Sequence, residues 1–377
     1  MFLNVSQRFI HHQGSFYLTH RQLFPIISMS HKSTHSTPWS EVRGMPFDKP
    51  SRQAQGREYI ERLKAPSIAE GLRVDTERCF LPRFENRDLA PSNASIEEIR
   101  GRAMDIIEFH THYVKREMLN PTWLNFLETI NPEFYAKIDD FSDRPELFIA
   151  YLKSQGVRYA VVLAEWAPAT SGSVSTEKVV EYCRGQEMLF PFTSLNPNAQ
   201  PDVAAKLQFY VKECGVKGLK LHPSYQFFYP NEARLYPLYA KAQELGIPLI
   251  FHIGTSIFKG TKLKYCNPIY LDDVAVDFPD LKIIMAHSGR GFWYDECFSL
   301  SRLHKNVYMD ITGLPPQNLL NYFPELEKNH DKVIFGSDWP TMPGGIGKNV
   351  EAIKCLPLRD KTIEAILYKN AYNILFG

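Results

Sequence analysis

Two histidines stand one residue apart at the end of an apolar run in the stretch DIIEFHTHY, residues 105–113. Side chains alternate between the two faces of a β-strand, so His110 and His112 face the same way if this run is a strand. Two neutral imidazoles on one face can form half of a site for zinc or a similar divalent ion. A lone histidine at a strand end is more often only hydrogen-bonded, so the metal interpretation needs partners from other parts of the chain.

Other titratable residues also stand where apolar runs end. They are Lys220, His222, His252, His287, Asp310 and Asp338. Buried strands do not tolerate so many titratable ends unless the residues meet a partner. His252 and Asp338 would complete a set of three nitrogens and one oxygen that leaves room for a water molecule, which the metal would ionise near neutral pH. His287 could act there as an acid or base or as a further ligand.

Eight short apolar runs alternate with helical segments such as 201–215 and 231–246. The runs are residues 105–109, 157–163, 188–195, 216–221, 248–251, 281–286, 306–310 and 332–336. Runs that are apolar throughout indicate parallel strands buried on both faces. Eight strand–helix units in about 270 residues predict an α/β fold of the (β/α)8 TIM-barrel type, in which catalytic groups collect at the C-terminal strand ends. The alternative, an open doubly wound sheet, predicts a glycine-rich turn after the first strand, and HTHY has none.

Composition and charge exclude several kinds of partner. Among 377 residues, 44% are hydrophobic, and 43 Lys and Arg balance 42 Asp and Glu, which gives no case for a nucleic acid or a membrane surface as partner. No apolar run approaches the roughly 18 residues that cross a bilayer. The six cysteines show no CxxC spacing and indicate reduced thiols inside a cell. The expected partner is a small-molecule substrate, and a homodimer is the default assembly.

The chain before the first strand differs from the rest. Residues 1–40 are rich in Ser and contain basic residues but no Asp or Glu, which is typical of a disordered leader or of an organelle transit peptide. Residues 41–103 form an N-terminal arm rich in Pro, Arg and Ser, and residues 104–377 form the barrel. The expected location is cytoplasmic, or mitochondrial if residues 1–40 are a transit peptide.

The motifs FHTH, GVKGLKLHP, FHIG, MAHSG, DITG and FGSDWP follow one another in this order. Together they resemble the amidohydrolase superfamily, and within it the amidohydrolase-related group that includes the aminocarboxymuconate-semialdehyde decarboxylase type. The resemblance covers roughly residues 104 to 377. It implies that His110, His112, His252 and Asp338 bind the metal, and that His287 is catalytic or binds a second metal. Asp338 would also accept a proton from the metal-bound water.

Lys220 separates two versions of this metal site. In two-metal members of the family a lysine at this strand is carboxylated and bridges the ions, whereas the decarboxylase-like relatives hold one ion, which we expect here. Without carboxylation, Lys220 would be an ammonium that pairs with a carboxylate or with substrate. Substrate contacts are predicted for His222, for Arg290, whose fork matches a carboxylate, and for Trp339 among the loop aromatics.

Three functions are compatible with this set of residues. The first expectation is hydrolysis of an amide, ester or lactone of a small molecule, carboxylated or aromatic in character, by metal-activated water. The alternative is non-oxidative decarboxylation, in which the metal orients an acid and a proton is delivered to carbon. The third is a non-catalytic binding member, which the complete ligand set disfavours.

Overall fold

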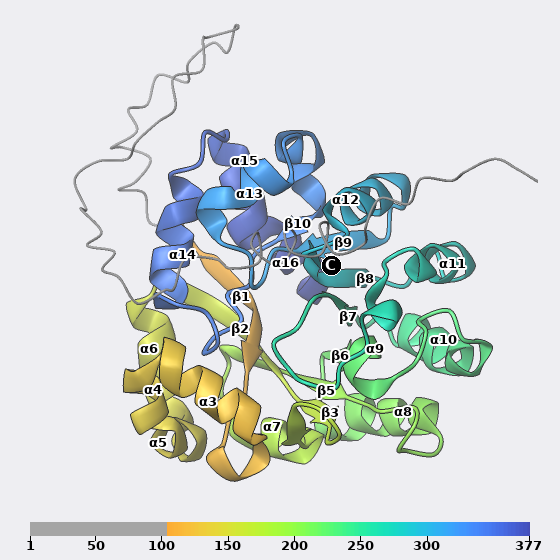
Figure 1. The fold of residues 1–377 in the computed structure, drawn as a ribbon, viewed down its shortest axis with the longest axis horizontal. Coiled ribbons are helices and arrows are strands. Elements are labelled where there is room, and N and C mark those ends of the chain that lie inside the picture. The colour runs from red at the N-terminus through yellow and green to blue at the C-terminus, as the bar shows by residue number, and fades with distance from the viewer. Residues whose placement is uncertain (1–103) are drawn as a thin grey trace, which may run out of the picture. The chain divides into compact units, whose positions relative to one another are not determined.

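Residues 104–377 are described by the computed structural model of the protein, and the predicted divisions at residues 1–40 and 41–103 lie outside them. In the described part, eight parallel strands follow one another in the order of the chain and helices surround them (Figure 1). The strands are β1 (Ile106–His112), β2 (Val157–Leu163), β5 (Leu189–Ser194), β6 (Gly218–Leu221), β7 (Leu249–Gly254), β8 (Ile283–Arg290), β9 (Val307–Asp310) and β10 (Val333–Ile334). The predicted TIM barrel and all eight of its strands are confirmed.

The first and last strands meet through backbone hydrogen bonds. Phe109 N donates to Phe335 O at 3.1 Å, and Asp338 N donates to His110 O at 3.0 Å. The buried carboxyl group of Glu108 adds to this contact, because its Oε1 accepts from Ser337 N at 2.8 Å. Residues 335–339, which directly follow β10, therefore close the ring against β1.

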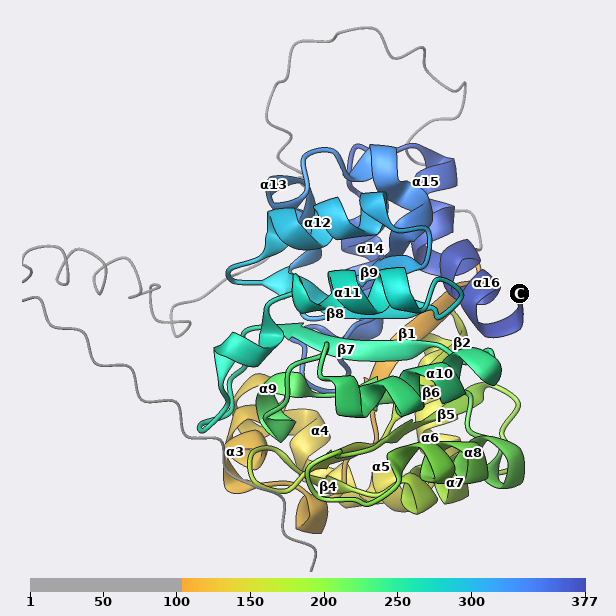
Figure 2. The same cartoon turned by 90° about the vertical axis from the view of Figure 1, so that its right-hand side faces the viewer.

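Helices cover the outside of the strands, and Figure 2 shows α10, α11 and α12 along one side of them. The helices are α3 (Pro121–Ile130), α4 (Pro132–Ala136), α5 (Ile138–Asp143), α6 (Pro145–Ser154), α7 (Thr176–Cys183), α8 (Val203–Cys214), α9 (Pro223–Gln226), α10 (Tyr236–Glu244), α11 (Tyr270–Asp277), α12 (Tyr294–Leu303), α13 (Leu319–Tyr322), α14 (Gly345–Lys354), α15 (Asp360–Glu364) and α16 (Asn370–Phe376). A short hairpin, β3 (Glu165–Ala167) and β4 (Gly172–Val174), follows β2 outside the barrel sheet. None of the helices within residues 104–377 has the length and apolar character to cross a membrane.

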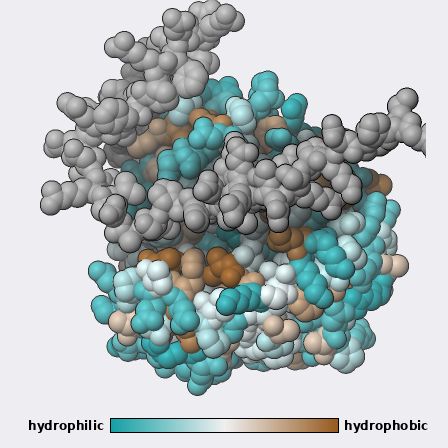
Figure 3. Space-filling model, in the orientation of Figure 1, coloured by the Kyte–Doolittle hydropathy of each residue, from teal (hydrophilic) through white to brown (hydrophobic). Residues whose placement is uncertain are grey.

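Both faces of the strands are apolar, as the uninterrupted sequence runs predict. In β7, Leu249 and Phe251 belong to the large core cluster, whereas Ile250 between them belongs to a smaller cluster that joins residues of several strands and α16. This alternation places one set of side chains against the helices and the other inside the ring. On the face drawn in Figure 3, hydrophobic residues gather near the middle and hydrophilic residues follow the lower rim.

Three strands are longer at their C-terminal ends than the apolar runs predict. β1 extends to His112, β7 extends past His252 to Gly254, and β8 extends past His287 to Arg290. Backbone pairing thus continues beyond the apolar residues to His112 in β1 and to His252 in β7. The pairing of β7 with β8 then shifts register between His252 and Gly254, and His287 stands in the unpaired part of β8.

Candidate functional site

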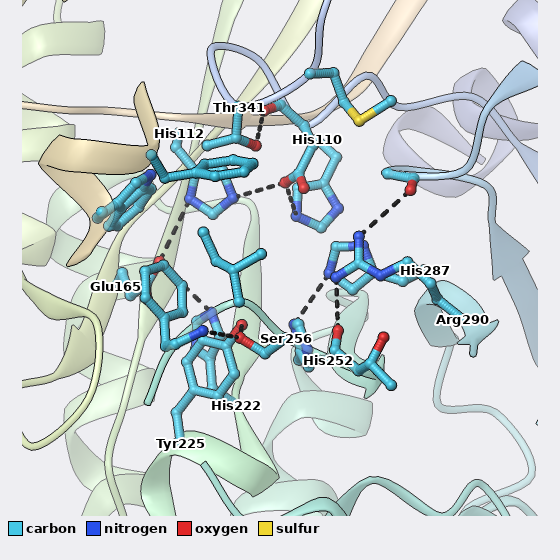
Figure 4. Close-up of a pocket in the computed structure, with 18 of the residues that line it drawn as sticks. His110, His112, Glu165, His222, Tyr225, His252, Ser256, His287, Arg290 and Thr341 are labelled. Atoms are coloured by element: carbon cyan, nitrogen blue, oxygen red, sulfur yellow. Dashed lines mark hydrogen bonds and ion pairs between the residues drawn. The ribbon is translucent and has the colours of Figure 1, made fainter. Parts of the chain in front are cut away.

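One pocket of about 330 Å³ lies at the C-terminal ends of the strands. Its lining includes eight of the nine residues that the sequence predicts for the site (Figure 4). They are His110, His112, Lys220, His222, His252, His287, Arg290 and Asp338. Side chains from four barrel strands, β1, β6, β7 and β8, and from the segments after β6 and β10 therefore converge on one space.

His110, His112 and Asp338 form the closest group of donor atoms. One ligand atom from each lies within 4.8 Å of the other two, and no other such group of His, Cys, Asp or Glu occurs within residues 104–377. Asp338 Oδ1 is 3.1 Å from His112 Nε2 and 3.7 Å from His110 Nε2. Two imidazole nitrogens and one carboxylate oxygen at this spacing fit a divalent cation.

The His110 ring is oriented by a second carboxylate. Its Nδ1 lies 2.6 Å from Asp310 Oδ2, and both side chains are fully buried. Because the carboxylate accepts, Nδ1 carries the proton and Nε2 offers a lone pair to the group. Burial, together with the nearby Lys220 charge, lowers the pKa of His110 to about 4, so the ring is neutral at physiological pH. A neutral imidazole with a fixed tautomer is the form that binds metals.

His252 and His287 form a second hydrogen-bonded pair in the same pocket. His287 Nδ1 donates to Thr312 O at 3.0 Å, so the neutral ring accepts at Nε2 from His252 Nδ1, also at 3.0 Å. His252 Nε2 is then a bare lone pair, and this buried atom has no hydrogen-bond partner among the described residues 104–377. An orphaned lone pair suits a metal ligand. His252 lies outside the group of three donors, however, so its predicted place in the ligand set stays a prediction.

Asp338 is held as a carboxylate. Burial alone would raise its pKa, but the close His112 ring, with Nε2 3.1 Å from Oδ1, and the other imidazoles hold the pKa well below its usual range. Both Asp338 and His287 have a left-handed φ of 65°. Non-glycine residues rarely adopt this conformation, and its occurrence at two strand ends of one pocket is typical of functional sites.

Lys220 is buried beside His110, with 1% of its surface exposed. Its Nζ is 3.1 Å from His110 Nε2, where an ammonium can donate to the lone pair. Burial lowers the pKa of Lys220 to about 8, while the carboxylates of Asp310, Asp338 and Glu165 oppose that shift. These contacts suit the ammonium interpretation, and a carboxylated Lys220 remains a prediction.

Arg290 ends β8 at the side of the pocket. Its Nη2 donates to Thr255 O at 2.6 Å and its Nη1 lies 3.4 Å from Gly313 O. The guanidinium is half-buried and lines the pocket, so it can still meet an anion there. A Cβ at position 313, where φ is 71°, would clash with Nη1, which explains the glycine.

Trp339 is the predicted substrate contact that the structure places elsewhere. It does not line the pocket and instead stacks on Phe148, with ring centroids 4.5 Å apart, and packs against Phe134. The left-handed backbone at Asp338 makes the side chains of Asp338 and Trp339 point in different directions. Asp338 faces the pocket, whereas Trp339 packs between the barrel and the helices. Trp339 therefore packs in the core, and its contact with substrate stays a prediction.

Several lining residues were not predicted from the sequence, and four of them matter most for the character of the pocket. They are Trp123, Phe126, Glu165 and Phe258. The aromatic three lie in a helix and a loop that carry no pattern linking them to the pocket. Glu165 did carry a signal, because it stands two residues beyond the end of β2 at Leu163. It is buried, accepts a hydrogen bond from the Ser171 hydroxyl, and has its pKa raised by burial.

Comparison with known proteins identifies a family that the chain matches and several solved structures of similar fold. A family model described as amidohydrolase matches residues 107–377. An uncharacterised TIM-barrel protein from Bordetella bronchiseptica is similar with a TM-score of 0.61 at 23% identity, over 72% of this chain and 98% of the other. A dihydroxybenzoic acid decarboxylase from Polaromonas sp. JS666, with bound manganese and the inhibitor 2-nitroresorcinol, has a TM-score of 0.55 at 17% identity, over 72% and 97%. The 5-carboxyvanillate decarboxylase from Sphingomonas paucimobilis has a TM-score of 0.54 at 14% identity, over 72% and 99%.

Proposed function

This chain belongs to the amidohydrolase family, and from that premise we propose that it is a metal-dependent carboxy-lyase acting on a small aromatic carboxylic acid. The sequence alone favours hydrolysis, with decarboxylation as the alternative. Two decarboxylases of similar fold support the alternative instead. The observation that carries the proposal is the half-buried Arg290 in an aromatic-walled pocket beside the candidate metal ligands.

The pocket suits a flat acid in size and character. Its volume of about 330 Å³ is at the lower end of the range for small-molecule sites. Trp123 and Phe258 meet edge to face with ring centroids 5.5 Å apart, and Tyr225 packs against Phe258 at the same distance. Such rings stack well on a planar substrate, while the Arg290 fork matches a carboxylate.

His110, His112, His252 and Asp338 would hold the cation. A divalent ion bound there supplies positive charge that neutralises and orients an anionic substrate. The nitrogen-rich set favours zinc, whereas a decarboxylase of similar fold binds manganese, so both ions belong in the test. One ion is expected if Lys220 is an ammonium.

The other residues of the pocket would bind the substrate, support catalysis and exclude water. In the proposed reaction the bond between the ring carbon and the carboxylate breaks, carbon dioxide leaves, and the electron pair on the ring carbon takes up a proton that originates from solvent. Arg290 would orient the acid. Asp338 and His287 remain the proposed catalytic residues, and the hydrogen bond to Thr312 fixes the His287 ring in the pocket. The aromatic walls would exclude water from the reacting carbon.

A two-part experiment tests the proposal. Metal content of the purified protein is measured first, with about one divalent ion per chain expected. The protein loaded with zinc or manganese is then incubated with dihydroxybenzoic acids, 5-carboxyvanillate and related acids, and with esters and lactones of the same size. Carbon dioxide release is followed, and the reaction in heavy water is examined for deuterium at the ring carbon.

The expected result is carbon dioxide and a deuterated ring from at least one acid, both abolished in Asp338→Asn. Turnover of an ester or lactone without carbon dioxide release would assign hydrolysis instead. Full activity after removal of all metal would contradict both reactions.

A further inference from the structure

The β3–β4 hairpin is an insertion that is firmly attached to the barrel. Trp166 N donates to Ser194 Oγ at 3.2 Å, and Trp166 O accepts from Gln226 Nε2 at 3.0 Å. On its other side, Ser171 O accepts from Asn120 N at 3.1 Å. The hairpin is thus held by β5, by α9 and by the start of α3, so its side chains are fixed relative to the pocket.

The packing of the hairpin is too close for a larger residue at its turn. At Gly172, where φ is 151°, a Cβ would lie 2.5 Å from Met118 O. The consequence is a rigid support for Glu165, the first residue of the hairpin, which is 2% exposed. The Ser171 hydroxyl donates to its Oε1 and leaves Oε2 to face the histidines.

Glu165 Oε2 meets the side of His112 that faces away from the donor group. It lies 3.5 Å from His112 Nδ1 and farther, 3.9 Å, from His222 Nε2. The first distance is slightly longer than a hydrogen bond, as is common in ligand-free sites. His112 Nδ1 is buried and has no hydrogen-bond partner within residues 104–377, and the Glu165 carboxylate lies beside it.

The two histidines of the pair therefore have the same arrangement. Each directs Nε2 toward Asp338, and each has a buried carboxylate at Nδ1: Asp310 for His110 and Glu165 for His112. Imidazoles that ligate metals almost always donate their other N–H to a carboxylate, carbonyl or water. The single proton of the neutral His112 ring can be on Nδ1 or on Nε2. Asp338 Oδ1 lies 3.1 Å from Nε2 and would accept that proton if it were there.

We propose that Glu165 is a positioning residue that keeps the proton of His112 on Nδ1 and so frees Nε2 for a divalent cation. This inference rests on the metal site of the proposed function. Its chemistry requires an acceptor at Nδ1, which the hairpin supplies from outside the barrel sheet. Without Glu165 the proton would move to Nε2 and donate to Asp338, and the cation would lose a ligand.

The test measures cation affinity and the tautomer separately, on full-length protein. Dissociation constants for zinc and manganese are determined by competition with a fluorescent chelator, for wild type, Glu165→Ala and Glu165→Gln. Nitrogen-15 spectra of histidine-labelled, metal-free protein report which His112 nitrogen carries the proton. The matched control is Glu177→Gln, since Glu177 bonds to the Tyr210 hydroxyl at 2.5 Å and does not line the pocket.

We expect Glu165→Ala to raise the dissociation constant by about 10- to 100-fold and to shift the His112 proton to Nε2. Glu165→Gln should lose less, because the amide oxygen still accepts, and Glu177→Gln should match wild type. If Glu165→Ala does not fold, Ser171→Ala is used instead, because it removes only the hydroxyl that orients Glu165. It should raise the dissociation constant and shift the His112 proton in the same direction, by smaller amounts.

Two failures are distinguishable. Wild-type protein that binds neither cation would refute the metal site of the proposed function. Wild-type protein that binds, while Glu165→Ala binds equally well or keeps the wild-type tautomer, would refute the positioning role alone.

Discussion

Asp310→Asn changes one atom at the base of the candidate metal site and should nevertheless weaken it strongly. Asp310 Oδ1 accepts from Thr312 N at 2.9 Å and from the Thr312 hydroxyl, so an asparagine there would keep its oxygen at that position. Its amide NH2 would then replace the acceptor that lies 2.6 Å from His110 Nδ1. Because the amide donates, His110 would have to carry its proton on Nε2, which faces Asp338.

The expected loss follows from the hydrogen bond that is removed. A hydrogen bond to a charged group contributes about 1.5–3 kcal/mol, which corresponds to roughly 10- to 150-fold in a dissociation constant. Competition titration with a fluorescent chelator measures this for zinc and manganese, and circular dichroism verifies the fold. Asp280→Asn is the control, because that side chain is 77% exposed. A folded Asp310→Asn protein whose dissociation constants stay within about threefold of wild type would refute the reasoning.

Three further substitutions test other parts of the site. Arg290→Lys should raise KM for the acid by about tenfold and change kcat less, because a lysine cannot form the paired hydrogen bonds of the fork. Gly336→Ala would place a Cβ 2.6 Å from His110 Cβ, so urea unfolding should show a loss of about 1–3 kcal/mol, accompanied by weaker cation binding. Trp339→Phe should also lower the unfolding free energy by about 1–3 kcal/mol but leave KM unchanged, since the ring packs in the core.

Each of these has its own contrary result. An unchanged KM in Arg290→Lys would remove the carboxylate contact from that residue. Gly347→Ala serves as control for Gly336→Ala, because its Cβ would meet only the end of the Gln155 side chain. Equal stability in the two variants would contradict the steric argument. A raised KM in Trp339→Phe would show that this ring contacts substrate, against what its packing indicates.

The sequence carried most of the architecture and part of the site. Parallel strands buried on both faces appear as apolar runs, and this pattern located all eight strands of the barrel. The alternation of side chains placed His110 and His112 in one pocket, although the pairing of β1 with β2 shifts register between Glu108 and Thr111. The C-terminal edge of the barrel then brought Asp338 to them.

What the sequence could not indicate was the direction of the chain after each strand. The left-handed φ of Asp338 decides that Trp339 enters the core, and no composition rule predicts this value at an aspartate. Trp123 and Phe258 reach the pocket from a helix and a loop, not from the end of a strand. The strand pattern in the sequence therefore could not predict that they line the pocket. Glu165 follows a strand end but within an irregular insertion, where a carboxylate usually faces solvent.

The ring closes between β1 and residues 335–339, and the same two segments supply His110, His112 and Asp338. A cation held by these three would fasten together parts of the chain that are 226 residues apart, much as a cross-link does. Ligand binding to the folded state raises stability in proportion to the logarithm of ligand concentration over its dissociation constant. Removal of the ion should therefore destabilise the contact between β1 and residues 335–339 before other parts of the barrel. Amide hydrogen exchange should accelerate in these two segments before it does in β5 or β6.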